Sequence, residues 1–332
     1  MEQLPIAEAV DEGDLNVLPA SVALLSDQDR TALTAAVVDL EYPGLVARAS
    51  DVLATPIEFG LKVLPARARD TVTAACRSAI EKALDVSLWT MDTSFVAEDK
   101  PQASSDWWHM GAVAVTGTVG GFVGFASLPV ELPLSTIIIL RSIADIARSE
   151  GEDLDTAEAR LECVAVFSLG GSSDRDDDAE IGYFFAREAM ASMISRTTAY
   201  YEAQVAKQVA EKVAKAAAAG AAKAAAKAAL QEATAVANKV QSTALVKFTE
   251  AVASRYSVVV TESAMAKAGP IIGAALGGIV NSLFISHFQA VARAHFTVRR
   301  LEREHGQASV QAAYASIAEE VKRERRMQKH AE

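Results

Sequence analysis

The chain is poor in cysteine, histidine and aromatic residues. Its 332 residues include two cysteines, five histidines and 6% aromatic residues. Cys76 and Cys163 are too few for a disulfide framework or a zinc cluster. The sequence also lacks HExxH, GxSxG and a Walker-type loop ending in GK[ST]. We therefore predict no cofactor and no metal site, and no catalytic residue can be assigned from a motif.

A signal peptide and an excess of positive charge are missing as well. The first residues, MEQLPIAEAVDEGD, have neither a positive region nor an apolar region, so we expect a cytoplasmic protein. The formal net charge of -11 argues against nucleic acid as the main partner, because phosphate binding needs clustered lysine and arginine. Hydrophobic residues make up 51% of the chain, which suffices for a large core.

Apolar residues recur at helical spacing, and no segment has a convincing strand pattern. This predicts an all-α multi-helix bundle, with a flexible acidic lead at 1–25, a helical domain at 26–318 and a charged tail at 319–332. Helix starts are expected at Ser26 and at either Thr156 or Asp155, and a helix end at Gly306. The run SVVV is compatible with either helix or strand.

From Met110 to Leu140 the only charged residue is Glu131. A Gly-rich half comes first, then a turn expected at Pro129–Pro133, then an aliphatic half. Glycine recurs every fourth position in this segment and again in 269–284, which lets two helices pack closely. The pattern predicts a central apolar helical hairpin with these packing or membrane glycines: Gly117, Gly120, Gly121, Gly124, Gly269, Gly273 and Gly277.

Three environments are compatible with this hairpin. We favour the buried centre of a soluble bundle, because glycine lowers the hydrophobicity and Glu131 would be costly in a bilayer. Membrane insertion is the alternative, since about 20 apolar residues are long enough to span a bilayer. In a third state, a soluble form hides the hairpin and exposes it on a membrane.

A set of charged residues flanks the apolar run. Arg141 and Asp145 are four residues apart, and Arg148 follows Asp145 by three, so both pairs can form ion pairs on a helix. We favour an internal network that fixes packing. A polar functional site is the alternative, with these candidates: Glu131, Arg141, Asp145, Arg148 and His109.

The acidic loop at 174–180 resembles the start of a calcium loop. Ala179 and Phe185 stand where that loop needs glycine and glutamate, so we favour a solvated loop.

Alanine and lysine dominate residues 202–250, which predicts a long helix or a helical hairpin with a bend at Gly220. We favour a solvated hairpin. A second interpretation is a basic face for anionic headgroups, formed by Lys207, Lys212, Lys215, Lys223 and Lys227. A third is a coiled-coil or homo-oligomer face, formed by Val205, Val209 and Val213.

Five blocks together resemble the EcsC family. They are PIEFGLKVLP (56–65), LPVELPLSTIIILRSIADIARSEGEDL (128–154), ARLECVAVFSLGG (159–171), GYFFAREAM (182–190), and GPIIGAALGGIVNSLF with AHFTVRRLEREHG (269–306). The family is named for a bacterial protein encoded beside an ABC transporter. The resemblance implies a role near the membrane, in transport or secretion, but no catalytic residues.

Our leading hypothesis is a non-enzymatic helical protein that associates peripherally or reversibly with the inner membrane or with a membrane complex. The uncharged Gly-rich segments and the basic helix motivate it. A hydrolase with a site near Glu131 and Arg141 is one alternative, and a soluble protein-interaction scaffold is another.

Overall fold

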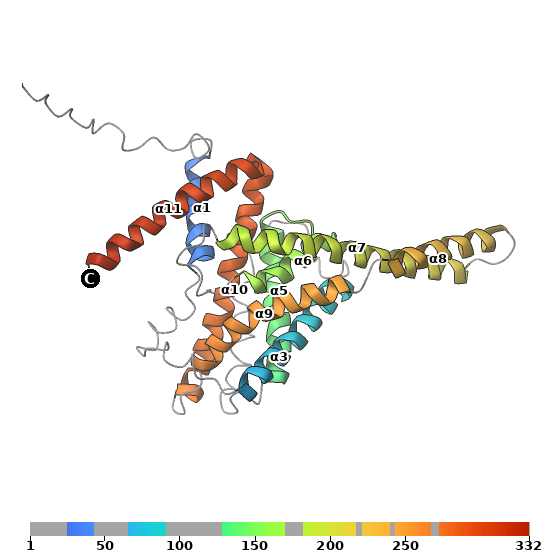
Figure 1. Ribbon diagram of the computed structural model, residues 1–332, viewed down its shortest axis with the longest axis horizontal. Coiled ribbons are helices and arrows are strands. Elements are labelled where there is room, and N and C mark those ends of the chain that lie inside the picture. Colours follow the sequence, from blue (N-terminus) through green and yellow to red (C-terminus); the bar gives the residue numbers. More distant parts are fainter. Residues whose placement is uncertain are drawn as a thin grey trace, which may run out of the picture.

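Helices form all of the regular structure in the part of the chain that the computed structural model describes, which is residues 25–42, 66–90, 128–169, 182–216, 221–239, 243–266 and 272–331 (Figure 1). This confirms the predicted all-α bundle. The elements are α1 (Asp27–Glu41), α3 (Ala66–Asp85), η2 (Val86–Thr90), α5 (Leu128–Ser149), α6 (Ala157–Ala165), η5 (Val166–Ser168), α7 (Gly182–Ala216), α8 (Ala221–Lys239), α9 (Thr243–Ala266), α10 (Ile272–His305) and α11 (Gln307–Ala331).

The predicted helix boundaries at three capping residues are confirmed. The Ser26 hydroxyl accepts a hydrogen bond of 3.1 Å from the amide of Asp29 at the start of α1. Thr156 caps α6 in the same way through the amide of Ala159. Gly306 has φ +86° and separates α10 from α11. Side-chain acceptors and a left-handed glycine therefore define these boundaries locally.

The turn predicted at Pro129–Pro133 is wrong, because α5 begins at Leu128 and includes both prolines. Pro129 lies in the first turn of the helix, where its missing N–H would have no partner within the helix. Pro133 lies inside the helix, where it removes one backbone hydrogen bond. Beyond Pro133, the Thr136 hydroxyl donates a hydrogen bond of 2.7 Å to the carbonyl of Leu132. The apolar run thus continues directly into one helix of 22 residues.

The Ala/Lys-rich region forms a helical hairpin that projects sideways from the bundle (Figure 1). We call it the arm: the part of α7 from Val205 onward, together with α8. Gly220 lies outside the described residues. The ambiguous SVVV run belongs to α9, where it is helical.

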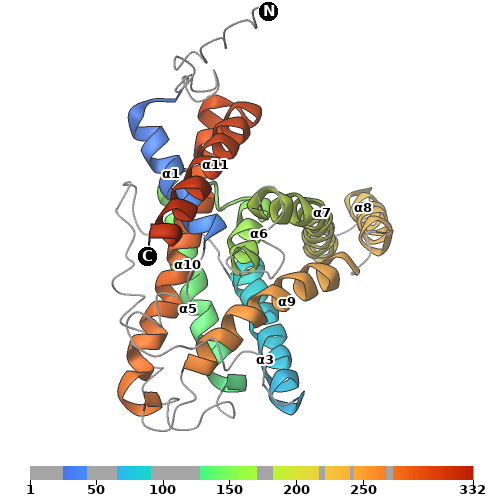
Figure 2. The same ribbon diagram turned by 60° about the vertical axis from the view of Figure 1, so that its left-hand side comes forward.

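Helices α3, α5 and α10 point in the same direction (Figures 1 and 2). Gln289 of α10 donates a hydrogen bond of 2.8 Å to the Ser142 hydroxyl of α5. These two residues are 147 positions apart in the chain. Toward the C-terminal end of α10, Arg299 contacts Glu152, which is also 147 positions away. The constant separation shows that α5 and α10 are parallel, so their N-terminal ends lie at one end of the bundle.

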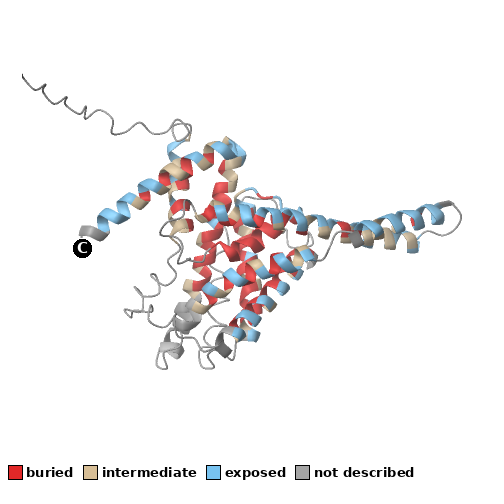
Figure 3. Ribbon diagram, viewed as in Figure 1, coloured by how far each residue is buried: buried red, intermediate tan, exposed pale blue. Residues whose placement is uncertain are grey.

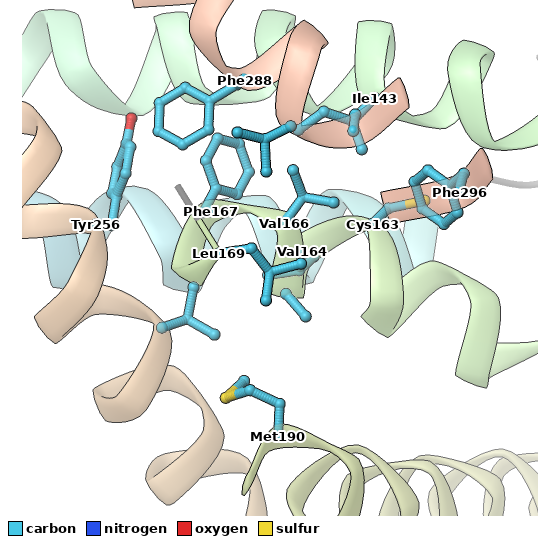
Figure 4. Packing of buried hydrophobic residues seen from close by; sticks show 14 of the residues in the cluster. Ile143, Cys163, Val164, Val166, Phe167, Leu169, Met190, Tyr256, Phe288 and Phe296 are labelled. Atoms are coloured by element: carbon cyan, nitrogen blue, oxygen red, sulfur yellow. The ribbon is translucent and has the colours of Figure 1, made fainter. Parts of the chain in front are cut away.

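The core lies where these three helices meet α6, η5 and α9 (Figure 3). The Phe167 ring of η5 lies 5.0 Å from the ring of Tyr256 and 5.1 Å from that of Phe288 (Figure 4). The Tyr256 hydroxyl is paired with that of Thr136 at 2.8 Å. The short segment α6–η5 is therefore inserted into the centre of the molecule, which brings Glu162 with it.

Candidate functional site

The N-terminal turns of α5 and α10 are almost free of charge, and we call the end of the bundle that they form the apolar end. It comprises the N-terminal parts of α5 and α10, where residues 128–140 contain only Glu131 and residues 272–292 contain no charged residue. The register of 147 positions places Leu128 level with residue 275. Gly273 and Gly277 therefore lie in the turns of α10 that are level with the start of α5.

Two large apolar side chains at this end are exposed. Val130 is 79% exposed and Leu134 is 52% exposed, and both follow directly after the Gly-rich segment. The N-terminal end of α3 lies at the same end of the bundle (Figure 1). Peripheral membrane proteins present exposed apolar side chains of this kind to a bilayer.

Part of the predicted hairpin falls beyond the described residues. Gly273 and Gly277 are in α10, although their packing is not described. None of the helices in the described ranges has the length and hydropathy needed to cross a membrane. The packing role of the glycines therefore stays a prediction. The other predicted glycines and His109 lie outside the described residues, namely Gly117, Gly120, Gly121, Gly124 and Gly269.

The opposite end of the bundle is charged, and Arg299 is at its centre. Its guanidinium donates two hydrogen bonds to Glu152, at 2.8 and 3.0 Å, and one of 2.9 Å to Glu162. Arg303 also donates to Glu152. These bonds tie the loop after α5, the helix α6 and the helix α10 together.

A second branch of this network runs from Glu162 to α7. The His295 imidazole is fully buried, and its Nε2 lies 3.3 Å from a Glu162 oxygen. Its Nδ1 is 2.9 Å from the Tyr183 hydroxyl. In a neutral ring that carries its proton on Nε2, Nδ1 can accept a hydrogen bond from the tyrosine and the Nε2 proton faces the Glu162 carboxylate. Nearby, Arg187 binds Glu302 with two bonds of 2.8 and 2.7 Å.

Burial and charge set the ionisation of this network. Burial lowers the pKa of His295, and the nearby guanidinium groups act in the same direction against the opposing effect of Glu162. Burial disfavours the ionised form of Glu162, but contact with His295 and the charge of Arg299 outweigh it, so its pKa lies below the usual value. Burial raises the pKa of Tyr183. We infer a neutral histidine between an anionic glutamate and a neutral tyrosine.

Although Tyr183, His295 and Glu162 resemble a catalytic relay, they are sealed from solvent. All three side chains are buried, and each of their described contacts is with another part of the bundle. A substrate would have no access without opening three helices. The network therefore fastens α6, α7 and α10 at the charged end.

The charged residues predicted as a polar site all lie on α5. Asp145 and Arg148 form the predicted ion pair at 3.2 Å. Glu131 and Arg141 are ten residues apart on this helix, which corresponds to about 15 Å along its axis. One small ligand cannot contact both, and whether either residue has a functional role stays a prediction.

One group has the composition of a metal site. Asp29, Glu304 and His305 offer ligand atoms that all lie within 4.8 Å of one another. Arg300 is 3.8 Å from Asp29 and 3.2 Å from Glu304. Because a guanidinium already balances the carboxylates, we assign this group to ion pairing between α1 and α10.

The arm combines positive charge with small side chains. Residues 205–230 contain five lysines and one glutamate, and residues 202–239 contain neither arginine nor an aromatic residue. Ala203, Ala226 and Ala237 are buried, whereas Val209 and Val213 are exposed. The acidic loop at 174–180 lies outside the described residues.

Motif reasoning did not identify the buried network. Its members come from three helices and from the loop after α5. The spacing of four residues within α7 and within α10 does not indicate which helices come into contact. The blocks that carry the family resemblance contain them, however: Glu162, Tyr183 and Arg187, and His295 and Arg299. The family resemblance was therefore the one sequence feature that could have drawn attention to these residues.

The model of the EcsC protein family matches residues 43–301. Comparisons with curated proteins and with solved structures gave no match.

Proposed function

The chain belongs to the EcsC protein family, and we propose that it associates peripherally and reversibly with a membrane through its apolar end. The observation that supports this proposal is the parallel packing of α5 and α10, whose uncharged N-terminal turns therefore lie at one end of the bundle. The charged network occupies the other end.

The exposed side chains support the same assignment. Val130 and Leu134 are apolar, but the bundle buries only a small part of their surface. Burying a valine or leucine in an apolar phase contributes about 1.5–3 kcal/mol. A few such residues suit reversible binding better than permanent insertion.

Vesicle flotation tests this function directly. The full-length protein is mixed with vesicles of phosphatidylcholine, alone or with phosphatidylglycerol. We expect the wild type to float, and Val130→Asp to bind at least about tenfold more weakly because an aspartate is costly in an apolar phase.

The matched control is Val246→Asp, because Val246 is also exposed, at 43%, and lies in the first turn of α9, near the charged end. This variant should float like the wild type, and both variants should keep the wild-type melting temperature. A wild-type protein that stays unbound with every lipid mixture would refute the proposed function, as would normal flotation of Val130→Asp.

A further inference from the structure

The arm leaves the bundle at the charged end, far from the apolar end. The first turns of α7 contact α10 through Tyr183 with His295 and through Arg187 with Glu302. Further along α7, the Tyr201 hydroxyl donates to the carbonyl of Leu88, just beyond the C-terminal end of α3. All of these contacts lie at the C-terminal ends of the parallel helices.

The distance between the two features follows from the geometry of α10. His295 is about 20 residues beyond the turns of α10 that are level with the start of α5, which corresponds to about 30 Å along the helix axis. In both views α7 and α8 cross the direction of α5 and α10 instead of following it (Figures 1 and 2). The arm therefore stays at the level of the charged end.

Salt screens electrostatic attraction over a distance as long as the one between the arm and the apolar end. At physiological ionic strength the Debye length is about 8 Å. Lysines held about 30 Å from a membrane at the apolar end would not be attracted by its headgroups. The positive charge of the arm is therefore available to a different anionic partner.

The chemistry of the arm indicates which kind of partner. Strong protein interfaces depend on tryptophan, tyrosine and arginine anchors, and residues 202–239 contain none of them. Lysine is a mobile point charge that suits a diffuse phosphate surface. Two arms would also repel each other, since each carries five lysines against one glutamate in residues 205–230.

We propose that the arm binds the anionic headgroups of a second bilayer, so that the protein bridges two membrane surfaces. This inference rests on the proposed function, which places the apolar end on the first bilayer. Each lysine near an anionic surface contributes about 1 kcal/mol, so the five lysines in residues 205–230 are sufficient for reversible binding.

Vesicle clustering, followed by turbidity and light scattering, separates bridging from binding. The test variant is Lys223→Glu with Lys227→Glu, both exposed on α8. The matched control is Lys82→Glu with Lys247→Glu, which are also exposed but lie on α3 and α9. Both pairs change the net charge equally, and glutamate keeps the helix propensity of lysine.

We expect the wild type to cluster vesicles that contain phosphatidylglycerol, and added salt to reverse the clustering. The arm variant should float with single vesicles like the wild type but need at least about tenfold more protein to cluster them. The control pair should cluster normally.

Several outcomes would overturn bridging while leaving the proposed function intact. These are a wild type that floats without clustering, an arm variant that clusters normally, and a control pair that loses clustering equally.

Loss of flotation in the arm variant would show that the arm is the primary contact and would also overturn bridging. Duplex DNA binding that needs the arm lysines, in a wild type that clusters no vesicles, would assign the arm to nucleic acid instead. A wild type that does not float at all would instead refute the proposed function.

Discussion

Gln289 of α10 donates a hydrogen bond of 2.8 Å to the hydroxyl of Ser142 in α5, across 147 positions of the chain. Both side chains are buried, so the bond forms only when these two helices are aligned in this register. The alignment brings the uncharged N-terminal turns of α5 and α10 to one end and the charged residues around Arg299 to the other. The difference between the uncharged end and the charged end therefore depends on the pairing of two helices that are far apart in the sequence.

Replacing Arg299 with alanine should be strongly destabilising. The change leaves the carboxylates of Glu152 and Glu162 buried without their main cation, which typically costs about 3–5 kcal/mol. Urea denaturation monitored by circular dichroism measures the loss. Arg77→Ala is the control, because Arg77 forms only half-exposed ion pairs, and it should cost less than about 1 kcal/mol. Equal effects of the two substitutions would contradict the central role of Arg299.

Acid should destabilise the protein in two steps. Burial lowers the pKa of His295 from its usual value of 6.5, so below that pH the unfolded chain binds a proton that the folded protein does not. Stability therefore falls as the pH drops below about 6.5. The lowered pKa values of Glu152 and Glu162 give a contribution that is present above their usual 4.5 and is lost as the pH falls through their folded values.

Denaturation midpoints measured across this pH range test both steps. His295→Gln should lack the step that begins near 6.5 and keep the loss below 4.5. An unchanged profile in this variant would show that His295 is not the titrating group.

Glu41→Ala should weaken the attachment of α1 to the bundle. The Glu41 carboxylate accepts hydrogen bonds from the amides of Gly182 and Tyr183, at 3.1 and 3.3 Å, and from the Tyr314 hydroxyl, at 2.8 Å. It thus caps α7 from another helix. Its removal should cost about 1–3 kcal/mol in a thermal or urea unfolding experiment. Glu319→Ala, an exposed change on α11, should have little effect, and the idea fails if it is equally damaging.

Gly306→Ala should cost about 1–2 kcal/mol, because a φ of +86° strains any residue with a Cβ. No atom lies within 4 Å of the added Cβ, so the cost comes from the backbone alone. Gly306→Asn should be less damaging, since asparagine tolerates this region better. Equal melting temperatures for all three proteins would show that the turn relaxes.

Local features were predictable because their causes are local. The caps at Ser26 and Thr156 and the break at Gly306 depend on neighbouring backbone groups. The Asp145–Arg148 pair likewise depends on the spacing of one helix. The turn at Pro129–Pro133 failed because proline permits either a turn or the start of a helix.

The candidate sites were less predictable. Arg299 and Glu162 are 137 positions apart, so nothing in the order of residues indicates their contact. The arm was foreseen as a helix or a hairpin from its alanine content, but not its level on the bundle, which follows from contacts such as Arg187 with Glu302.

The sequence by itself determined that the chain is helical, where several helices begin and end, and that two segments lack charge, because propensity, capping and composition act over a few residues. Only the tertiary structure decided that the uncharged N-terminal turns of α5 and α10 share one end, that a histidine is buried between a tyrosine and a glutamate, and that the lysine-rich arm lies far from the apolar end. The physical reason is that these relationships depend on packing between helices, where burial and paired charges select one register among many.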